Sequence, residues 1–263
     1  MIHVVISGAA GRMGRTLVRL VAESEDTRLI GAVEASGHPC LGGDAGLLAG
    51  AGDLGVPLSE ALPEKFDVLV DFSLPEGSIQ RVEACAAAGV PCVVGTTGFS
   101  AAQRERLRAA AEKTALVLSP NMSVGVNVMF HVAADLARTL GPDYDIEIVE
   151  AHHRFKKDAP SGTALKVAEE IAKVTGRSLA ESAVHGRGPG QAPRKAGEIG
   201  LHAIRGGDIV GEHIVYYTGL GERLELKHVA HSRETFARGA LRAARWVADR
   251  GPGLYSMADV LGL

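Results

Sequence analysis

The feature that most constrains the fold lies near the N-terminus, where a β-rich run leads straight into a turn of closely spaced glycines. The run is Ile2–Ser7, and the turn reads Gly8-Ala9-Ala10-Gly11-Arg12-Met13-Gly14. A helical pattern follows at once, with Leu17 and Val21 on its apolar face. Glycines allow a tight turn, close approach of the backbone to a pyrophosphate, and close packing of helix on strand. The segment therefore predicts the opening of a dinucleotide-binding fold, although a glycine turn also occurs for packing alone.

A P-loop is the competing phosphate-binding motif. Counted from Gly8, it requires glycine at position 13 followed by Lys and then Ser or Thr. The chain instead has Met13, Gly14 and Arg15, so this motif is excluded.

An acidic residue follows the second β-rich run. That run spans residues 28–33 and ends in Glu34, about 20 residues beyond the last glycine, where a carboxylate binds the ribose hydroxyls of adenosine. The next residue, Ala35, offers no guanidinium for a 2′-phosphate, and Glu34 would repel that phosphate. We therefore expect NADH to be preferred over NADPH, with Arg12 as a cation able to swing toward a 2′-phosphate.

Strand-like and helical runs alternate as far as residue 122. Further strands are expected at 67–73, 90–94 and 115–118, helices at 75–88 and 99–112, and a loop over 36–53. Such alternation is typical of a doubly wound parallel sheet, whose ligand lies beyond the carboxyl ends of the strands. The residues expected to border a nicotinamide are therefore those that follow the strands: Phe72, Ser73, Gly95, Thr96, Thr97, Gly98, Ser119, Pro120, Asn121 and Met122.

The pattern changes after residue 122. It predicts a helix over 123–140, an alternating strand at 144–150, a helix capped by Ser161, a Gly- and Pro-rich connection over 176–197, and strands at 199–205, 208–217 and 222–231. Leu224 and Leu226 alternate with charged residues, as in a strand with one face against a core. We expect an α+β domain with an open mixed sheet over residues 123–232. A final helix capped by Ser232 and a tail over 255–263 return the chain to the first domain, which comprises 1–122 and 233–263.

Composition limits the partners. The chain has 263 residues, 46% of them hydrophobic, and a net charge of -3, so it has a substantial core but no broad basic field for nucleic acid or an anionic membrane. No signal peptide and no run of about 18 apolar residues is evident, which predicts a cytoplasmic protein. The three cysteines lack the spacing of a metal or redox motif and are expected to be reduced.

A compact cluster of histidines and cations follows the strand at 144–150. It reads Glu150-Ala151-His152-His153-Arg154-Phe155-Lys156-Lys157 and continues as Asp158-Ala159-Pro160-Ser161-Gly162-Thr163. Cations and the first-turn N–H groups of a helix bind carboxylates, and histidine exchanges protons near neutral pH. We expect a local site for a small di-acid, against the alternative of a solvated loop. A metal site is disfavoured, because adjacent histidines diverge from an extended backbone and no partner stands at i, i+4.

Several of these segments together resemble the 4-hydroxy-tetrahydrodipicolinate reductase family, also called dihydrodipicolinate reductases. The resemblance covers essentially the full length, and E-A-H-H-R with K-x-D-A-P-S-G-T is its most specific part. The other matching segments are 8–14, 95–98, Asn121 with 123–127, and 205–213. Ala35 departs from the pattern, since members that use NADPH well have arginine there.

The resemblance implies a reaction and its residues. Hydride would pass from NAD(P)H to C4 of the ring as the cyclic 4-hydroxy di-acid loses water, in the diaminopimelate route to lysine. His152 would donate or accept a proton, Lys156 would be a second donor, and His153, Gly162 and Thr163 would hold the carboxylates. A homotetramer formed through the second domain's sheet is also implied. A different two-domain NAD(P) oxidoreductase and a non-catalytic NAD-binding sensor are the alternatives.

Overall fold

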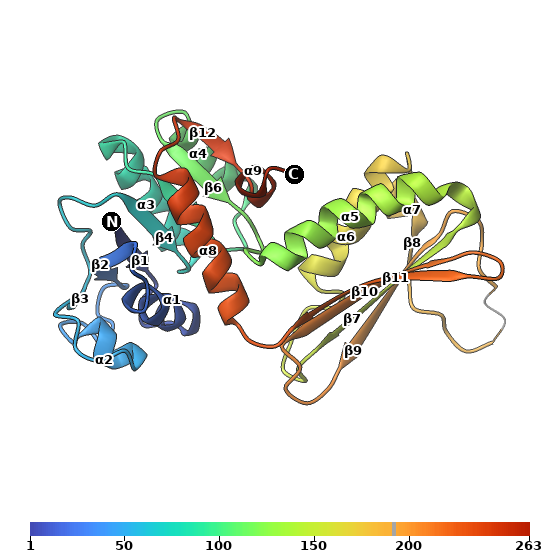
Figure 1. Cartoon of the computed structure of the whole chain (residues 1–263), viewed down its shortest axis with the longest axis horizontal. Coiled ribbons are helices and arrows are strands. Elements are labelled where there is room, and N and C mark those ends of the chain that lie inside the picture. Colours follow the sequence, from blue (N-terminus) through green and yellow to red (C-terminus); the bar gives the residue numbers. More distant parts are fainter. Residues whose placement is uncertain (191–192) are drawn as a thin grey trace. The chain divides into compact units, whose positions relative to one another are not determined.

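The computed structural model describes residues 1–190 and 193–263, and the chain divides into two compact units. Unit 1 comprises residues 1–124 and 233–263, and unit 2 comprises residues 125–232. Unit 2 is therefore inserted, as one continuous segment, between two parts of unit 1 (Figure 1).

Unit 1 is built on a parallel sheet with the strand order β12-β6-β5-β4-β1-β2-β3. Its strands are β1 (Ile2–Ser7), β2 (Thr27–Val33), β3 (Leu58–Ser59), β4 (Val68–Asp71), β5 (Cys92–Val94), β6 (Ala115–Leu118) and β12 (Gly253–Tyr255). Alternate residues of one strand enter different apolar clusters: Val4 and Ile6 face one, and Val5 faces the other. The sheet is thus buried on both faces, which explains its nearly continuous apolar runs.

Helices cover both faces of this sheet (Figure 1). They are α1 (Arg12–Ala22), α2 (Ala45–Ala49), α3 (Pro75–Ala88), α4 (Ala101–Ala111), α8 (Glu234–Val247) and α9 (Met257–Leu261). Apolar side chains of α1, α8 and α9 belong to one cluster, and those of α3 and α4 to the other. This arrangement confirms the expected doubly wound α/β fold.

Unit 2 contains a mixed five-stranded sheet with the order β11-β10-β7-β9-β8. Its strands are β7 (Asp145–His152), β8 (Ala183–His185), β9 (Ile199–Arg205), β10 (Gly211–Thr218) and β11 (Arg223–Ala230). β10 pairs antiparallel with β7 and β11, whereas β7, β9 and β8 pair in parallel. The helices are α5 (Val124–Leu140), the 3-10 helix η1 (Gly141–Asp143), α6 (Gly162–Val174) and α7 (Leu179–Ser182). Apolar side chains of α5 and α6 pack with the sheet in a core that belongs to unit 2 alone.

Two segments expected to be irregular contain short elements. The 36–53 loop holds α2, because Asp44 caps this helix through Leu47 N–H and also accepts hydrogen bonds from Leu54 and Val56. The 176–197 connection holds α7 and β8, and residues 191–192 of it lie outside the described residues. Elements of three to five residues are too short to produce a hydrophobic period, which is why the sequence did not predict them.

Two local predictions were wrong. The N-cap of α8 is Arg233 rather than Ser232. Leu224 in β11 is 38% exposed, so the alternation of that strand does not put this side chain against a core. Within residues 1–190 and 193–263, no helix has the length and apolar character needed to cross a membrane.

Candidate functional site

The glycine turn lies between β1 and α1 and has little room for side chains. Gly8 has a φ of 75°, a left-handed conformation that favours glycine. A Cβ on Gly14 would overlap the Gly8 carbonyl oxygen and the backbone of Ala9. Gly11 N–H donates to Gly8 O at 3.0 Å, which closes the turn. Glycine is thus required for the helix to start directly beside the strand end.

Glu34 lies beside this turn. Its carboxylate accepts a hydrogen bond from Ala10 N–H at 2.8 Å and one from Ala35 N–H at 3.2 Å. The carboxylate therefore sits between the end of β2 and the glycine turn, within reach of a ligand bound to that turn.

A cavity of about 880 Å³ opens in unit 1 at this place. Of the cofactor-site residues predicted from the sequence, those that line it are Gly8, Ala10, Gly11, Glu34, Phe72 and Ser73. The rest do not: Ala9, Arg12, Met13, Gly95, Thr96, Thr97, Gly98, Ser119, Pro120, Asn121 and Met122. The cavity extends instead along α3 as far as Ala84, and it includes Arg81, a residue to which sequence reasoning gave no role.

A buried polar network centred on Asp71 joins the ends of β1, β4 and β5, and a backbone hydrogen bond links the end of β6 to β5. Asp71 accepts hydrogen bonds from Thr96 Oγ1 at 2.6 Å, from Ser73 Oγ at 2.9 Å, and from Ser7 Oγ. Ser119 N–H donates to Val94 O at 3.2 Å. The predicted residues Thr96 and Ser119 therefore lie at the carboxyl edge of the sheet. Asp71, which the sequence did not single out, positions Thr96.

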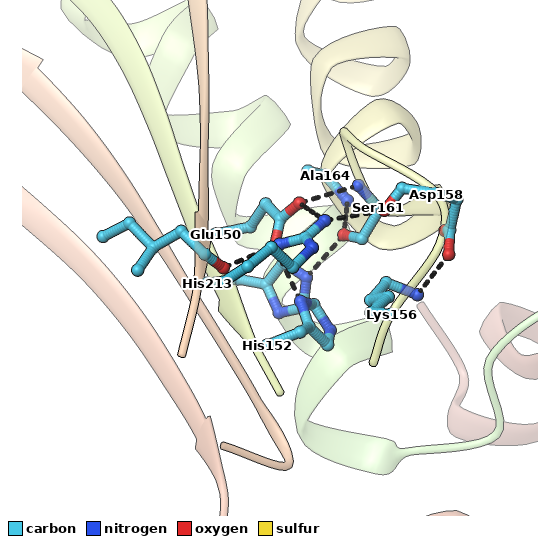
Figure 2. Close-up of polar contacts among 9 residues, drawn as sticks. Glu150, His152, Lys156, Asp158, Ser161, Ala164 and His213 are labelled. Carbon is cyan, nitrogen blue, oxygen red and sulfur yellow. Dashed lines mark hydrogen bonds and ion pairs between the residues drawn. The ribbon is translucent and has the colours of Figure 1, made fainter. Parts of the chain in front are cut away.

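The histidine cluster is organised in unit 2 by a second buried carboxylate, that of Glu150 (Figure 2). Glu150 and His152 are two residues apart in β7, so their side chains lie on the same face of the strand. Arg205 ends β9 opposite His152, and His213 in β10 pairs with Glu150. Three neighbouring strands thus contribute the polar groups, and Ser161, the N-cap of α6, completes the set.

Glu150 accepts four hydrogen bonds. Arg205 donates two, from Nη1 and Nη2, each at 2.7 Å. Ser161 N–H donates at 3.0 Å, and His152 Nδ1 lies 2.6 Å from the carboxylate. Burial acts to raise the pKa of Glu150, but the bonds from Arg205, His152 and Ser161 outweigh it and hold the pKa below its ordinary value. Because Glu150 is an acceptor, Nδ1 of His152 carries the proton and Nε2 is left for a ligand.

The His152 side chain is buried, with 11% of its surface exposed. Burial lowers its pKa below the ordinary value, against the opposing effect of Glu150. His213 stands edge-on to it, with ring centroids 5.2 Å apart, and has Nε2 at 3.0 Å from Ser161 Oγ. Burial lowers the pKa of His213 to about 3, so this ring is neutral. It packs against His152 and forms a hydrogen bond with Ser161.

The other predicted site residues lie in the loop after β7 and at the start of α6. Lys156 forms an ion pair with Asp158 at 2.9 Å (Figure 2). Gly162 and Thr163 form the first turn of α6, as predicted, beside the Ser161 cap. His153 follows β7 directly, and its Nδ1 is a buried atom that has no hydrogen-bond partner within the described parts of the chain. Glu150, Arg205 and His213 had no predicted roles, although a Glu two residues before a His in an alternating strand signals a shared face.

A doubly wound dinucleotide-binding fold, interrupted by a mixed-sheet domain with a buried Glu-His pair and a neighbouring lysine, defines a two-domain oxidoreductase. Models of the two halves of one family match the chain: dihydrodipicolinate reductase N-terminus over residues 2–122, and dihydrodipicolinate reductase C-terminus over residues 125–261. The chain belongs to the dihydrodipicolinate reductase family.

Individual relatives agree with this family assignment. A 4-hydroxy-tetrahydrodipicolinate reductase of Anaeromyxobacter dehalogenans is 50% identical over 267 residues, covering 100% of this chain and 98% of the relative. A dipicolinate-bound dihydrodipicolinate reductase from Paenisporosarcina sp. TG-14 superposes with a TM-score of 0.78 at 27% identity and covers 98% of both chains. A gentamicin A biosynthesis protein solved with NAD, GenD2, shares the fold at 16% identity, with a TM-score of 0.53 and coverage of 86% of this chain and 72% of its own.

Proposed function

We propose that this chain reduces 4-hydroxy-tetrahydrodipicolinate, with loss of water, by hydride transfer from NAD(P)H in the diaminopimelate route to lysine. The observation that carries the proposal is the Glu150–His152 pair at the end of β7, with Lys156 in the loop that follows. Family membership supports the reaction, and the dipicolinate-bound relative supports a small planar di-acid as the substrate class.

The cofactor site is proposed in unit 1. Gly8, Gly11 and Gly14 close a tight turn at the start of α1, which supports binding of a pyrophosphate by the N–H groups there. The carboxylate of Glu34 beside that turn supports binding of the ribose hydroxyls, and the strand ends at Gly95 to Thr97 and Ser119 to Met122 are suited to the nicotinamide. When bound, the reduced nicotinamide supplies the hydride. NADH is the preferred form, because Glu34 repels a 2′-phosphate and Ala35 provides no cation. The kcat/KM ratio for the two cofactors tests this preference, and a tenfold advantage for NADPH contradicts it.

The residues of unit 2 supply proton chemistry and substrate binding. His152 donates a proton from Nε2 as negative charge builds at C3 of the ring, and Lys156 is the second donor. Without a ligand, His152 has a lowered pKa and is neutral at pH 7. A di-anion bound by His153, Gly162 and Thr163 raises that pKa, because an opposite charge within a few ångströms favours the imidazolium. Binding of the substrate thus favours the protonated form of His152, which is the form that donates the proton.

The test is loss of NADH absorbance when freshly made substrate is added. His152→Gln and Lys156→Ala should each lower kcat by about 10²-fold or more and leave the NADH dissociation constant nearly unchanged, as expected for removal of a proton donor. Matched controls are His131→Gln and Lys173→Ala, which alter exposed side chains on α5 and α6. Wild-type kcat in both His152→Gln and Lys156→Ala contradicts the assigned roles, and the absence of NADH oxidation by the wild type contradicts the proposed reaction.

A homotetramer formed through the sheet of unit 2 is the proposed assembly. The edge strand β11 carries the exposed Leu224, and exposed sheet edges and apolar side chains are commonly covered by symmetric association. Light scattering coupled to size exclusion measures the mass directly. A monomer at micromolar concentration contradicts this assembly without affecting the proposed reaction.

A further inference from the structure

Arg81 places a guanidinium at the Glu34 end of the cavity in unit 1. The residue lies on α3, yet its Nη2 donates to the backbone carbonyl of Glu34 at 3.1 Å, and its Nη1 lies 3.5 Å from Ser73 Oγ. Glu34 and Arg81 are 47 positions apart in the sequence, so no local motif around Ala35 reveals this cation. Arg81 on α3 thus places a positive charge beside the end of β2, where the following residue, Ala35, has none.

The position of the guanidinium depends on Gly77. Long side chains on a helix lean toward its N-terminus, so Arg81 extends over the preceding turn. A Cβ on Gly77 would lie 2.8 Å from Arg81 Nη1, and outside the helix backbone the next nearest heavy atoms are Cζ and Nη2 of the same guanidinium, at 3.7 and 3.9 Å. Glycine at position 77 therefore lets the guanidinium lie close against the first turn of α3, beside the cavity that both residues line.

The charge of Arg81 is uncompensated by a carboxylate. Within the described part of the chain, no carboxylate oxygen lies within 4.0 Å of its guanidinium. Among the residues that line the cavity it is the single permanent cation, beside Glu34, Glu60 and Glu76. The Glu34 carboxylate is itself turned toward Ala10 N–H. Two of the five N–H donors of Arg81 have acceptors, which leaves the others for an anion.

We propose that Arg81 accepts the 2′-phosphate of NADPH, so that the chain uses a 2′-phosphorylated dinucleotide although alanine follows Glu34. The inference rests on the proposed function and concerns the ribose end of the same cofactor site. A guanidinium binds phosphate oxygens through two parallel N–H donors. This interaction offsets part of the repulsion from Glu34, so NADPH is bound although NADH stays the preferred form. Arg81 is then the specificity-determining residue, and its effect falls on NADPH far more than on NADH.

The experiment measures calorimetric dissociation constants for NADH and NADPH, without substrate, on the full-length protein. Arg81→Ala should raise the ratio of the NADPH constant to the NADH constant at least tenfold. Arg81→Lys should recover part of the loss, because it keeps the charge but not the paired donors. Arg108→Ala, which alters an exposed arginine on α4, is the matched control and should leave the ratio unchanged.

Gly77→Ala tests the same geometry without removing the charge. The substitution favours the helix, so the variant remains folded, while the new methyl displaces the guanidinium. It should raise the same ratio of constants in the wild-type background and have no further effect on it in the Arg81→Ala background.

The outcomes separate the inference from the proposed function. A wild type that binds neither dinucleotide overturns the proposed function. A wild type that binds NADH but not NADPH, or an Arg81→Ala variant that weakens both equally, overturns the inference and leaves the proposed function standing. The inference is supported if the ratio of the NADPH to the NADH dissociation constant rises tenfold in Arg81→Ala and is partly restored in Arg81→Lys.

Discussion

Glu150 is the residue on which the geometry of unit 2 depends. Its side chain has no exposed surface, yet its carboxylate is charged. Two hydrogen bonds from Arg205, one from His152 and one from a backbone N–H stabilise that charge. A buried carboxylate is tolerated only when such partners replace water. The arrangement fixes which nitrogen of His152 is protonated, so Glu150 is a positioning residue for the proposed proton donor.

Replacing the charge of Glu150 tests this role. Glu150→Gln keeps the shape but removes the negative charge that favours the imidazolium of His152, so the pKa of His152 should fall further. We expect kcat to fall by about 10²-fold, with the high-pH limb of the kcat profile displaced to lower pH. Glu150→Asp, which keeps the charge, should show a smaller displacement. An unmoved pH profile in a folded Glu150→Gln variant contradicts the positioning role.

His213 makes stability depend on pH. Its pKa is about 3 when folded against a model value of 6.5, so between these values the unfolded chain binds more protons and unfolding is favoured as pH falls. From pH 7 to pH 5 this histidine alone should cost roughly 2 kcal/mol of unfolding free energy. The groups that act on it electrostatically are His152, Glu150, His228 and Lys156.

The measurement is urea unfolding at pH 7 and pH 5. His213→Asn should be less stable at pH 7 but should lose less stability than the wild type on acidification. An equal loss in the two proteins contradicts the buried, neutral state of His213.

At the scale of single elements, prediction succeeded where a segment was long and its pattern was local. The boundaries of β1, β6, β9 and α3 were predicted to the residue, because apolar runs and a first-turn proline mark them. The contacts of Arg81 and Asp71 were not predictable, because their partners are brought close by the pairing and packing of distant elements. The Ser161 cap was predicted, but its second contact, with His213 across 52 residues, was not.

That second contact gives a prediction for α6. Ser161→Ala removes the helix cap and also leaves His213 Nε2 buried without its partner. The cap is worth about 1 kcal/mol and the unsatisfied nitrogen a further 1–3 kcal/mol or so. Ser100→Ala in α4 is the control, since Ser100 is an exposed cap with no such second contact. Equal losses of unfolding free energy in the two variants contradict the importance of the His213 contact.

At the scale of the whole molecule, each unit has its own sheet and its own core. The core of unit 2 is formed by residues between Met129 and Tyr217, with no contribution from unit 1. Residues 125–232 are also continuous in sequence. We therefore expect this segment, expressed alone, to unfold cooperatively in urea and to bind pyridine-2,6-dicarboxylate, because the Glu150 network lies wholly within it. A segment that is compact but binds no dicarboxylate contradicts the placement of the substrate site.

The split form of unit 1 also has a consequence for biosynthesis. Its larger core includes Ala237, Ala240, Ala244 and Val247 of α8, and the edge of its sheet is completed by β12. Both elements leave the ribosome only after all of unit 2 has been made. At about 5–20 residues per second, this interval is on the order of 10 s. During it the inserted domain can complete its own core, while the nascent first domain exposes an apolar face that the last part of the chain will cover. Docking of the carboxyl-terminal segment is thus the last step in the folding of unit 1. Chaperone binding to the exposed apolar face is expected during translation.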